Sequence, residues 1–154
     1  MYCYRNSKLE VLLVHPGGPY WIKEDIGIWS IPKGEYSEYE DPFNAAKREF
    51  KEETGYEAEG NFLLLTPRKQ PTGKIISAWA FEGECDALAI ESNTFTIEWP
   101  VQSGKLSRFF EVDRAEWFPI NLAKKKILKG QVGFIDELCE MLKYDSSLED
   151  ADPL

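Results

Sequence analysis

Three glutamates near the end of one predicted helix carry the strongest chemical signal in this sequence. Glu49, Glu52 and Glu53 are spaced i, i+3 and i+4, which places them on one helix face about 100° wide. Like charges at this spacing destabilise a helix by a few tenths of a kcal/mol per pair, and negative charge near a helix C-terminus costs roughly 0.3–1 kcal/mol more. A bound divalent cation would offset both costs, and carboxylate oxygens suit Mg²⁺ or Mn²⁺. A solvated acidic face is the alternative that these residues leave open.

The helix that carries these carboxylates has well-marked predicted ends. Asp41 is a favourable N-cap, and Pro42 suits the first helical position. Gly55 fits the position just past the C-terminus. The face predicted to enter the core comprises Phe43, Ala46 and Phe50. The sequence therefore predicts a helix that stops directly after the last glutamate.

The remaining segments alternate between predicted strands and helices. Strands are predicted over residues 8–14, 29–31, 62–65, 75–82, 95–99 and 116–119. Further helices are predicted over 121–128, capped by Asn121, and over 131–142. Residues 15–27 and 101–113 are expected to be loops. This mixture indicates one layered α/β domain over residues 1–144, followed by an acidic flexible tail over 145–154.

Composition excludes several function classes. The 154 residues include 43% hydrophobic and 29% charged side chains, which is an ordinary globular balance. A formal net charge of −9 disfavours a partner with an extended phosphate backbone. His15 is the only histidine, and the three cysteines form no C-x-x-C pair, which argues against a zinc site and a disulfide framework. Without a predicted membrane span or signal peptide, a cytoplasmic location is expected.

Residues upstream of the helix extend the glutamate pattern into a known motif. The segment from Gly34 to Tyr56 reads GEYSEYEDPFNAAKREFKEETGY. It matches all seven fixed positions of the Nudix box, G-x5-E-x7-R-E-U-x-E-E-x-G-U, where U is bulky and apolar. The only departure is Tyr56, where the family more often has an aliphatic residue. The chain therefore resembles a Nudix hydrolase.

Weaker similarity extends over most of the chain. The segments HPGGPYW, WSIPKGE, SNTFTIEWP and EVDRAEWF resemble a bacterial subgroup described as predicted nucleoside triphosphate pyrophosphohydrolases. The run W-x-x-P-K-G also resembles one in diadenosine tetraphosphate hydrolases. The family resemblance implies an α/β/α sandwich around a mixed β-sheet.

The same resemblance implies roles for the motif residues. Glu49, Glu52 and Glu53 would ligate Mg²⁺, or Mn²⁺, together with the Gly34 carbonyl. Arg48 would orient a neighbouring carboxylate. Glu40 would support the loop or the metal shell, and Glu49 could serve as ligand or as general base.

Residues outside the motif have two readings each. Glu111 lies six residues before Trp117, which resembles the placement of an additional metal-binding or basic carboxylate in several family branches; an exposed loop carboxylate is the other reading. Lys33 would contact a phosphate or be solvated. Tyr20, Trp29 and Trp99 could stack on a base, although core packing is favoured for each. Weaker phosphate-binding candidates are Arg68, Lys69, Lys105 and Arg108.

The resemblance implies Mg²⁺-dependent hydrolysis of a nucleoside diphosphate linked to another moiety, in the class of nucleoside triphosphates or dinucleoside polyphosphates. The alternative is a catalytically silent Nudix-like module that senses a nucleotide. An enzyme acting on RNA 5′ ends is disfavoured by the net charge. The expected partner is a small nucleotide, and a homodimer is left open. Specificity is expected to reside in loops 15–27 and 101–113.

Overall fold

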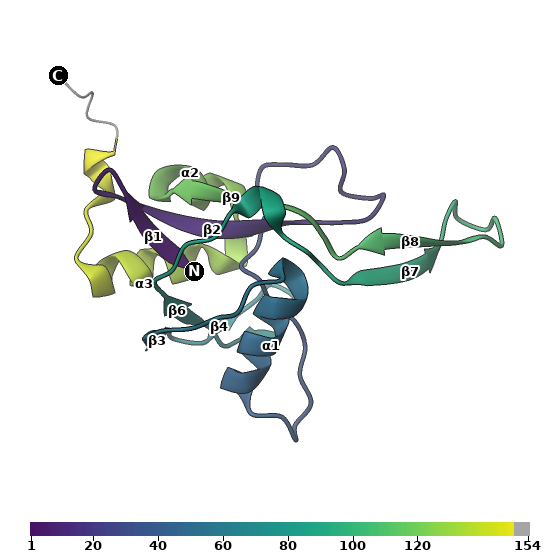
Figure 1. Cartoon of the computed structure of the whole chain (residues 1–154), viewed down its shortest axis with the longest axis horizontal. Helices are drawn as coiled ribbons and strands as arrows, with labels where there is room; N and C mark the ends of the chain where they lie inside the picture. Colours follow the sequence, from purple (N-terminus) through teal and green to yellow (C-terminus); the bar gives the residue numbers. More distant parts are fainter. Residues whose placement is uncertain (150–154) are drawn as a thin grey trace.

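The fold is built around one strand that is buried on both faces. The computed structural model describes residues 1–149. Strand β2 (Lys8–Pro16) lies between β1 (Tyr2–Arg5) and β9 (Val112–Pro119), and both pairings are antiparallel (Figure 1). Side chains alternate along a strand. Its odd-numbered residues Leu9, Val11 and Leu13 therefore enter one hydrophobic cluster, whereas Leu12 and Val14 enter another.

These two clusters define three layers. Helix α1 (Pro42–Thr54) packs Phe50 into the cluster of Leu12 and Val14. Helices α2 (Ile120–Lys126) and α3 (Val132–Leu142) fill the opposite cluster with their own apolar side chains. A parallel bridge between Tyr2 and Glu82 makes the sheet mixed. The expected α/β/α arrangement is confirmed.

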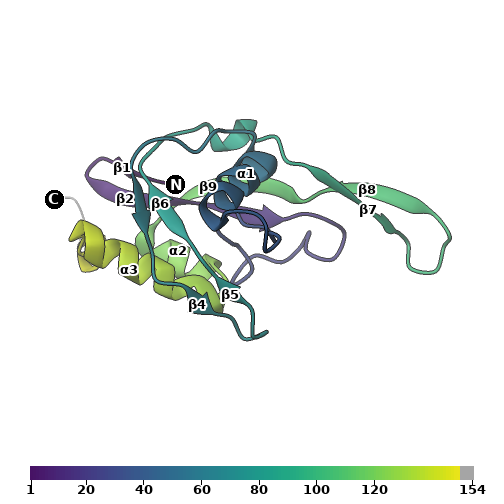
Figure 2. The ribbon, with the colours of Figure 1, turned by 90° about the horizontal axis from the view of Figure 1, so that it is seen from below.

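Two short strand pairs lie beside α3, and the first of them also packs Phe81 against Phe50 of α1 (Figure 2). Strand β3 (Phe62–Leu64) pairs with β6 (Trp79–Phe81), and β4 (Arg68–Lys69) pairs with β5 (Ile75–Ile76), all antiparallel. The single strand predicted over 75–82 is therefore two strands. The strand predicted over 29–31 is reduced to isolated bridges at Trp29 and Ser30.

A hairpin that the sequence did not reveal projects from the body. Strands β7 (Thr94–Glu98) and β8 (Leu106–Phe110) pair along their whole length and extend away from the sheet (Figures 1 and 2). The prediction of a loop over 101–113 is wrong, because β8 and the start of β9 fall within it. The sequence LSRFF lacks the clean alternation that marks a half-buried strand, so local pattern does not predict β8. We call residues 94–110 the arm.

The start of α2 is capped from a distant part of the chain. Asn121 is not the N-cap, because the helix already includes Ile120. The Glu149 carboxylate instead accepts hydrogen bonds from the backbone N–H groups of Ile120 and Asn121, each at 2.9 Å. Short 3₁₀ turns complete the fold, at Ala87–Ala89, Lys129–Gln131 and Ser146–Leu148.

The last of these 3₁₀ turns and Glu149 belong to the segment expected to be a flexible tail, of which residues 150–154 lie outside the described residues. Within residues 1–149, no helix has both the length and the apolar character needed to cross a membrane.

Candidate active site

Local signals place the end of helix α1 as the sequence predicted. The Asp41 side chain accepts a hydrogen bond from the Asn44 N–H at 3.0 Å, and Pro42 occupies the first turn. Gly55 adopts a left-handed conformation with φ of 81° and closes the helix through a bond from its N–H to the Lys51 carbonyl. The helix therefore ends one residue after Glu53.

Two of the three helix glutamates are buried against the loop that precedes the helix. Glu49 and Glu53, one turn apart, are 9% and 8% exposed. A Cβ atom placed on Gly34 would lie 1.9 Å from Glu49 Cδ, so the Glu49 carboxylate rests directly on the Gly34 backbone. Glu53 Oε2 accepts a hydrogen bond from the Lys33 N–H at 3.2 Å. Loop and helix thus meet at two buried carboxylates.

Arg48 donates hydrogen bonds to the carboxylates of Glu40, Glu49 and Glu52. Its guanidinium forms a bidentate pair with Glu40, with both bonds at 2.9 Å. It also donates to Glu49 Oε1 at 2.8 Å and to Glu52 Oε2 at 3.1 Å. These hydrogen bonds raise the Arg48 pKa and lower that of Glu40. Arg48 and Glu40 therefore hold two of the helix glutamates in place.

The surroundings of Glu53 disfavour its charged form. Burial raises the pKa of Glu53 to about 7, and the charges of Glu111 and Glu49 push it in the same direction against the Lys33 N–H. Burial also raises the pKa of Glu49, although the Arg48 hydrogen bond opposes this. Arg48 donates hydrogen bonds to Glu49 and Glu52 but not to Glu53. A bound cation would therefore stabilise the charged form of Glu53 more than that of the other two glutamates.

Glu111 is brought to the same end of α1 by the base of the arm. Its N–H donates to the Asn93 carbonyl at 2.8 Å, and the Asn93 N–H donates to the Glu52 carbonyl at 2.8 Å. Its own carbonyl accepts a hydrogen bond from the Gly17 N–H. Among the described residues, the exposed Glu111 side chain makes no hydrogen bond or ion pair. The predicted fourth carboxylate therefore lies beside the box without a partner.

The donor set fits a hard divalent cation in its chemistry. In residues 1–149, no three His, Cys, Asp or Glu side chains converge closely enough to enclose an ion as they stand. Glu49 and Glu52 point their oxygens at Arg48 instead. However, the two buried carboxylates lie one turn apart against the backbone of Lys33 and Gly34, and they offer the hard oxygen atoms that Mg²⁺ prefers. The burial of Glu53 without a cationic side-chain partner is the observation that favours such an ion.

A cavity of about 880 Å³ opens beside these carboxylates. Gly34 and Glu49 line one part, and apolar side chains of α1 and β6 line much of the rest. Phe43 and Trp79 face each other there with ring centroids 5.4 Å apart. Positive charge is supplied by Lys33, Lys47, Lys74 and Lys129. The sequence did not indicate this cavity, because its wall is assembled from many segments spread between Met1 and Leu138.

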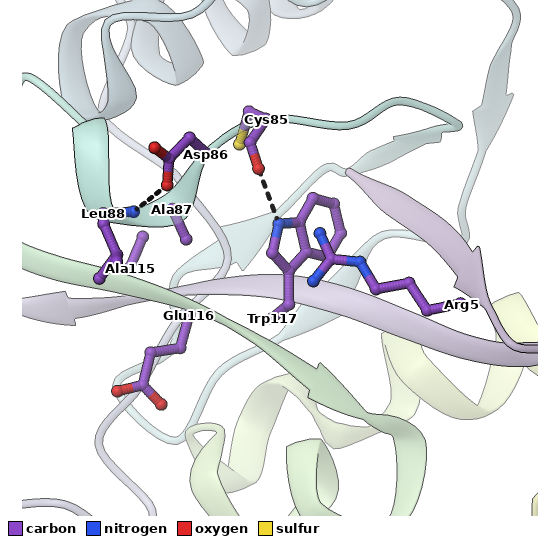
Figure 3. Close-up of a pocket in the computed structure, with 8 residues that line it drawn as sticks. All are labelled: Arg5, Cys85, Asp86, Ala87, Leu88, Ala115, Glu116 and Trp117. Carbon is purple, nitrogen blue, oxygen red and sulfur yellow. Dashed lines mark hydrogen bonds between the residues drawn. The ribbon is translucent and has the colours of Figure 1, made fainter.

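A smaller hollow of about 360 Å³ contains none of the predicted site residues. Arg5 lies over the Trp117 ring there, 4.9 Å from the centroid, and the Trp117 Nε1–H donates to the Cys85 carbonyl (Figure 3). Arg5 already pairs with Glu10 and Glu84. We therefore place the site at the larger cavity.

The other predicted contacts divide between core and surface. Trp29 is 1% exposed and packs in the core, as favoured. Tyr20 is 60% exposed, so core packing was wrong for this residue; its ring meets Trp99 edge-on at 5.2 Å. Arg68 binds Glu137 at 3.3 Å. The Lys33 side chain is exposed at the cavity wall.

Removal of the Glu53 charge is expected to stabilise the metal-free protein. The folded-state pKa is raised from 4.5 to about 7, so this group costs nothing below pH 4.5 and the loss of stability grows until about pH 7. Glu53→Gln keeps an acceptor for the Lys33 N–H and removes the charge. Chemical denaturation in EDTA should show the variant more stable by roughly 2–3 kcal/mol at pH 8, with the difference vanishing near pH 4.5. The exposed Glu59→Gln control should show no such pH dependence, and a pH-independent difference at Glu53 would contradict the burial argument.

Comparisons with known proteins are consistent with this geometry. A family model described as NUDIX domain matches residues 2–138. Nudix hydrolase 8 of Arabidopsis thaliana is 26% identical over 140 residues, which cover 88% of this chain and 33% of that protein. The chain therefore spans about a third of the length of this curated relative.

Two solved structures share the fold. The NUDIX domain of Shewanella oneidensis NrtR complexed with ADP ribose superposes with a TM-score of 0.62 at 17% identity, covering 92% of this chain and 82% of that one. A C. elegans Ap4A hydrolase binary complex gives a TM-score of 0.57 at 19% identity, covering 92% of both chains.

Proposed function

This chain belongs to the Nudix family, and we propose that it is a divalent-metal-dependent hydrolase of the diphosphate bond in a nucleotide. The observation that carries the proposal is the pair of buried carboxylates, Glu49 held against the Gly34 backbone and Glu53 bonded to the Lys33 N–H. Burial of two like charges without a full complement of cations is costly. A cation bound between the two carboxylates during the reaction would offset this cost.

We assign the metal to the Gly34 carbonyl and to the carboxylates of Glu49, Glu52, Glu53 and Glu111. When bound there, Mg²⁺ or Mn²⁺ would neutralise phosphate charge and lower the pKa of a bound water. Arg48 keeps Glu49 and Glu52 oriented through its hydrogen bonds. It binds Glu40 at the same time, so the orientation is fixed from outside the site.

One carboxylate must accept a proton from the attacking water. Glu111 suits this role because its oxygens are exposed and make no bond among the described residues, whereas Glu49 is occupied by Arg48. The backbone bonds of Glu111 to Asn93 and Gly17 hold it at the site. We therefore propose that a Glu111 carboxylate oxygen accepts the proton of the attacking water. Glu111 serves as a metal ligand when it does not act as the base.

The cavity supports a nucleotide as the substrate. Its apolar wall with Phe43 and Trp79 suits a flat base, and its lysines suit phosphate oxygens. Lys33 is the lysine next to Gly34, so we assign it to a phosphate. Two of the similar structures are named for ADP ribose and for Ap4A, which also supports a nucleotide ligand. We propose nucleoside triphosphates or dinucleoside polyphosphates as the substrate class.

A nucleotide sensor is the second candidate. The similar NrtR domain is complexed with ADP ribose, which supports nucleotide binding and leaves turnover open. The chain keeps all the carboxylates of the box, and this favours turnover. We further propose a cytoplasmic protein, since all three cysteines are free thiols, and we leave a homodimer open.

Product analysis on a nucleotide panel tests the proposal. The panel contains dinucleoside polyphosphates, nucleoside triphosphates and nucleotide sugars, each with Mg²⁺ or with EDTA, and products are identified by mass spectrometry. We expect cleavage of at least one compound at a diphosphate bond with Mg²⁺ and none with EDTA. Tight binding of several compounds without cleavage would favour the sensor. A panel in which no compound is bound or cleaved would contradict both candidate functions.

A further inference from the structure

The only histidine of the chain joins two segments beside the proposed site. His15 is fully buried at the end of β2. Its Nδ1 lies 2.8 Å from Asp113 Oδ1, and its Nε2 lies 2.7 Å from the Glu24 carbonyl oxygen. Buried polar groups are almost always hydrogen-bonded. Each ring nitrogen of His15 thus faces an oxygen acceptor in a different segment.

An irregularity in the sheet creates this arrangement. His15 pairs with Arg114, but Pro16 pairs with Val112, so Asp113 is an extra residue on β9. Such a bulge re-aims a side chain and is frequent next to active sites. Here it directs the Asp113 carboxylate to the His15 ring, two residues after Glu111.

Loop 17–27 is fixed at both ends around this contact. At its start, the Gly17 N–H donates to the Glu111 carbonyl at 2.8 Å, and a Cβ on Gly17 would lie 1.8 Å from the Phe110 carbonyl oxygen. At its end, His15 holds Glu24, and the Trp29 Nε1–H donates to Asp25 at 2.8 Å. The Trp29 ring also packs edge-on against His15, with centroids 5.1 Å apart.

The part of the loop between these anchors is apolar and exposed. Tyr20, Trp21 and Ile22 are 60%, 44% and 62% exposed. Tyr20 contacts Trp99 of the arm, and the arm begins beside Glu111. Exposed apolar side chains gathered in this way mark a binding surface, and the loop that carries them is bonded through Gly17 to the Glu111 backbone.

We propose that His15 is a positioning residue that couples loop 17–27 to segment 111–113 and thereby sets the surface that holds the variable part of the substrate. This rests on the proposed hydrolase function, because Glu111 belongs to that site. Glu111 keeps its backbone bond to Asn93 without His15. Loss of the contact should therefore weaken substrate binding more than it slows the chemical step.

Two variants test the coupling, with one matched control. His15→Gln removes the ring that contacts both Asp113 and Glu24. Asp113→Ala removes only the carboxylate contact, and the Asp113 side chain is already 31% exposed. Asp136→Ala is the control, because it deletes another surface carboxylate, which pairs with Lys124 and not with His15. All three are compared with the full wild-type chain.

The first readout is limited trypsin cleavage, followed by mass spectrometry. Lys23 lies inside the loop and directly precedes Glu24, while the exposed Lys105 lies in the arm and serves as the internal reference. We expect cleavage after Lys23 to accelerate about tenfold in His15→Gln and Asp113→Ala, as for loss of a hydrogen bond. Cleavage after Lys105 and the Asp136→Ala pattern should remain as in the wild type.

The second readout is the kinetics on the best nucleotide of the panel. We expect KM to rise about tenfold in both variants, with kcat within about threefold of wild type. Unchanged cleavage after Lys23, equal acceleration at Lys105, or a loss in kcat with unchanged KM would each overturn the proposal. If His15→Gln does not fold, Asp113→Ala decides by the same criteria. If no nucleotide is cleaved by the wild type, the proposed function fails, while trypsin cleavage still tests the coupling.

Discussion

Glu53→Gln is expected to abolish turnover while leaving the protein folded. The substitution removes one carboxylate charge that we assign to the metal and preserves the side-chain volume, and Gln still accepts the Lys33 hydrogen bond. Metal-assisted charge stabilisation contributes several kcal/mol to a reaction of this kind. We therefore expect kcat/KM to fall by about 10³-fold or more, measured by product formation on the best substrate of the panel.

The same variant should be more stable than the wild type in EDTA, as argued above from the raised pKa of Glu53. Opposite changes in activity and stability are typical of a charge kept for function. A general folding defect would lower both. Titration with Mn²⁺ should also show weaker metal binding in Glu53→Gln.

Glu59→Gln serves as the matched control for activity. Glu59 is exposed on the loop after α1, and its substitution should leave kcat/KM unchanged. Activity of Glu53→Gln within tenfold of the wild type would contradict the assignment of Glu53 as a ligand.

Gly34→Ala is expected to damage the site from the loop side. A Cβ at this position would lie 1.9, 2.0 and 2.2 Å from three atoms of the Glu49 carboxylate. These distances leave no room for a methyl group, and Glu49 is buried and held by Arg48. The loop and the carboxylate must therefore separate. A displacement of about 1 Å costs roughly 10²-fold in rate, so we expect kcat/KM to fall by about that factor.

The stability of Gly34→Ala should fall by roughly 1–3 kcal/mol, the usual cost of overpacking a well-fitted position, as measured by chemical denaturation. Ser37→Ala is a suitable control because Ser37 is exposed in the same loop and its carbonyl bond to the Glu40 N–H is unaffected. Wild-type activity in Gly34→Ala would show that the loop backbone is not part of the metal site.

The helix of the box illustrates what local sequence determines. Asp41, Pro42 and Gly55 act within one or two turns of their own positions, because capping and glycine conformation are short-range effects. The helix was therefore predicted with its correct ends. The spacing of Glu49, Glu52 and Glu53 also fixes their common face. This motif sufficed for the family, and the expected α/β/α layers followed.

Long-range contacts decided the features that the sequence did not reveal. Glu149 caps α2 from the C-terminal segment, and no local pattern could indicate this. Strand β8 forms because it pairs with β7, although its own residues alternate poorly. His15 belongs to no motif in the sequence, yet a bulge 98 positions away supplies it with the Asp113 carboxylate.

The sequence by itself determined the chemistry of this protein, because side-chain type and helical period are local properties. Only the tertiary structure decided the environment of that chemistry. Burial separates Glu53 from Glu52, although both are glutamates of the same helix face. The cavity and the anchored loop 17–27 depend on contacts between segments distant in the chain, and such contacts are fixed by packing of the whole fold.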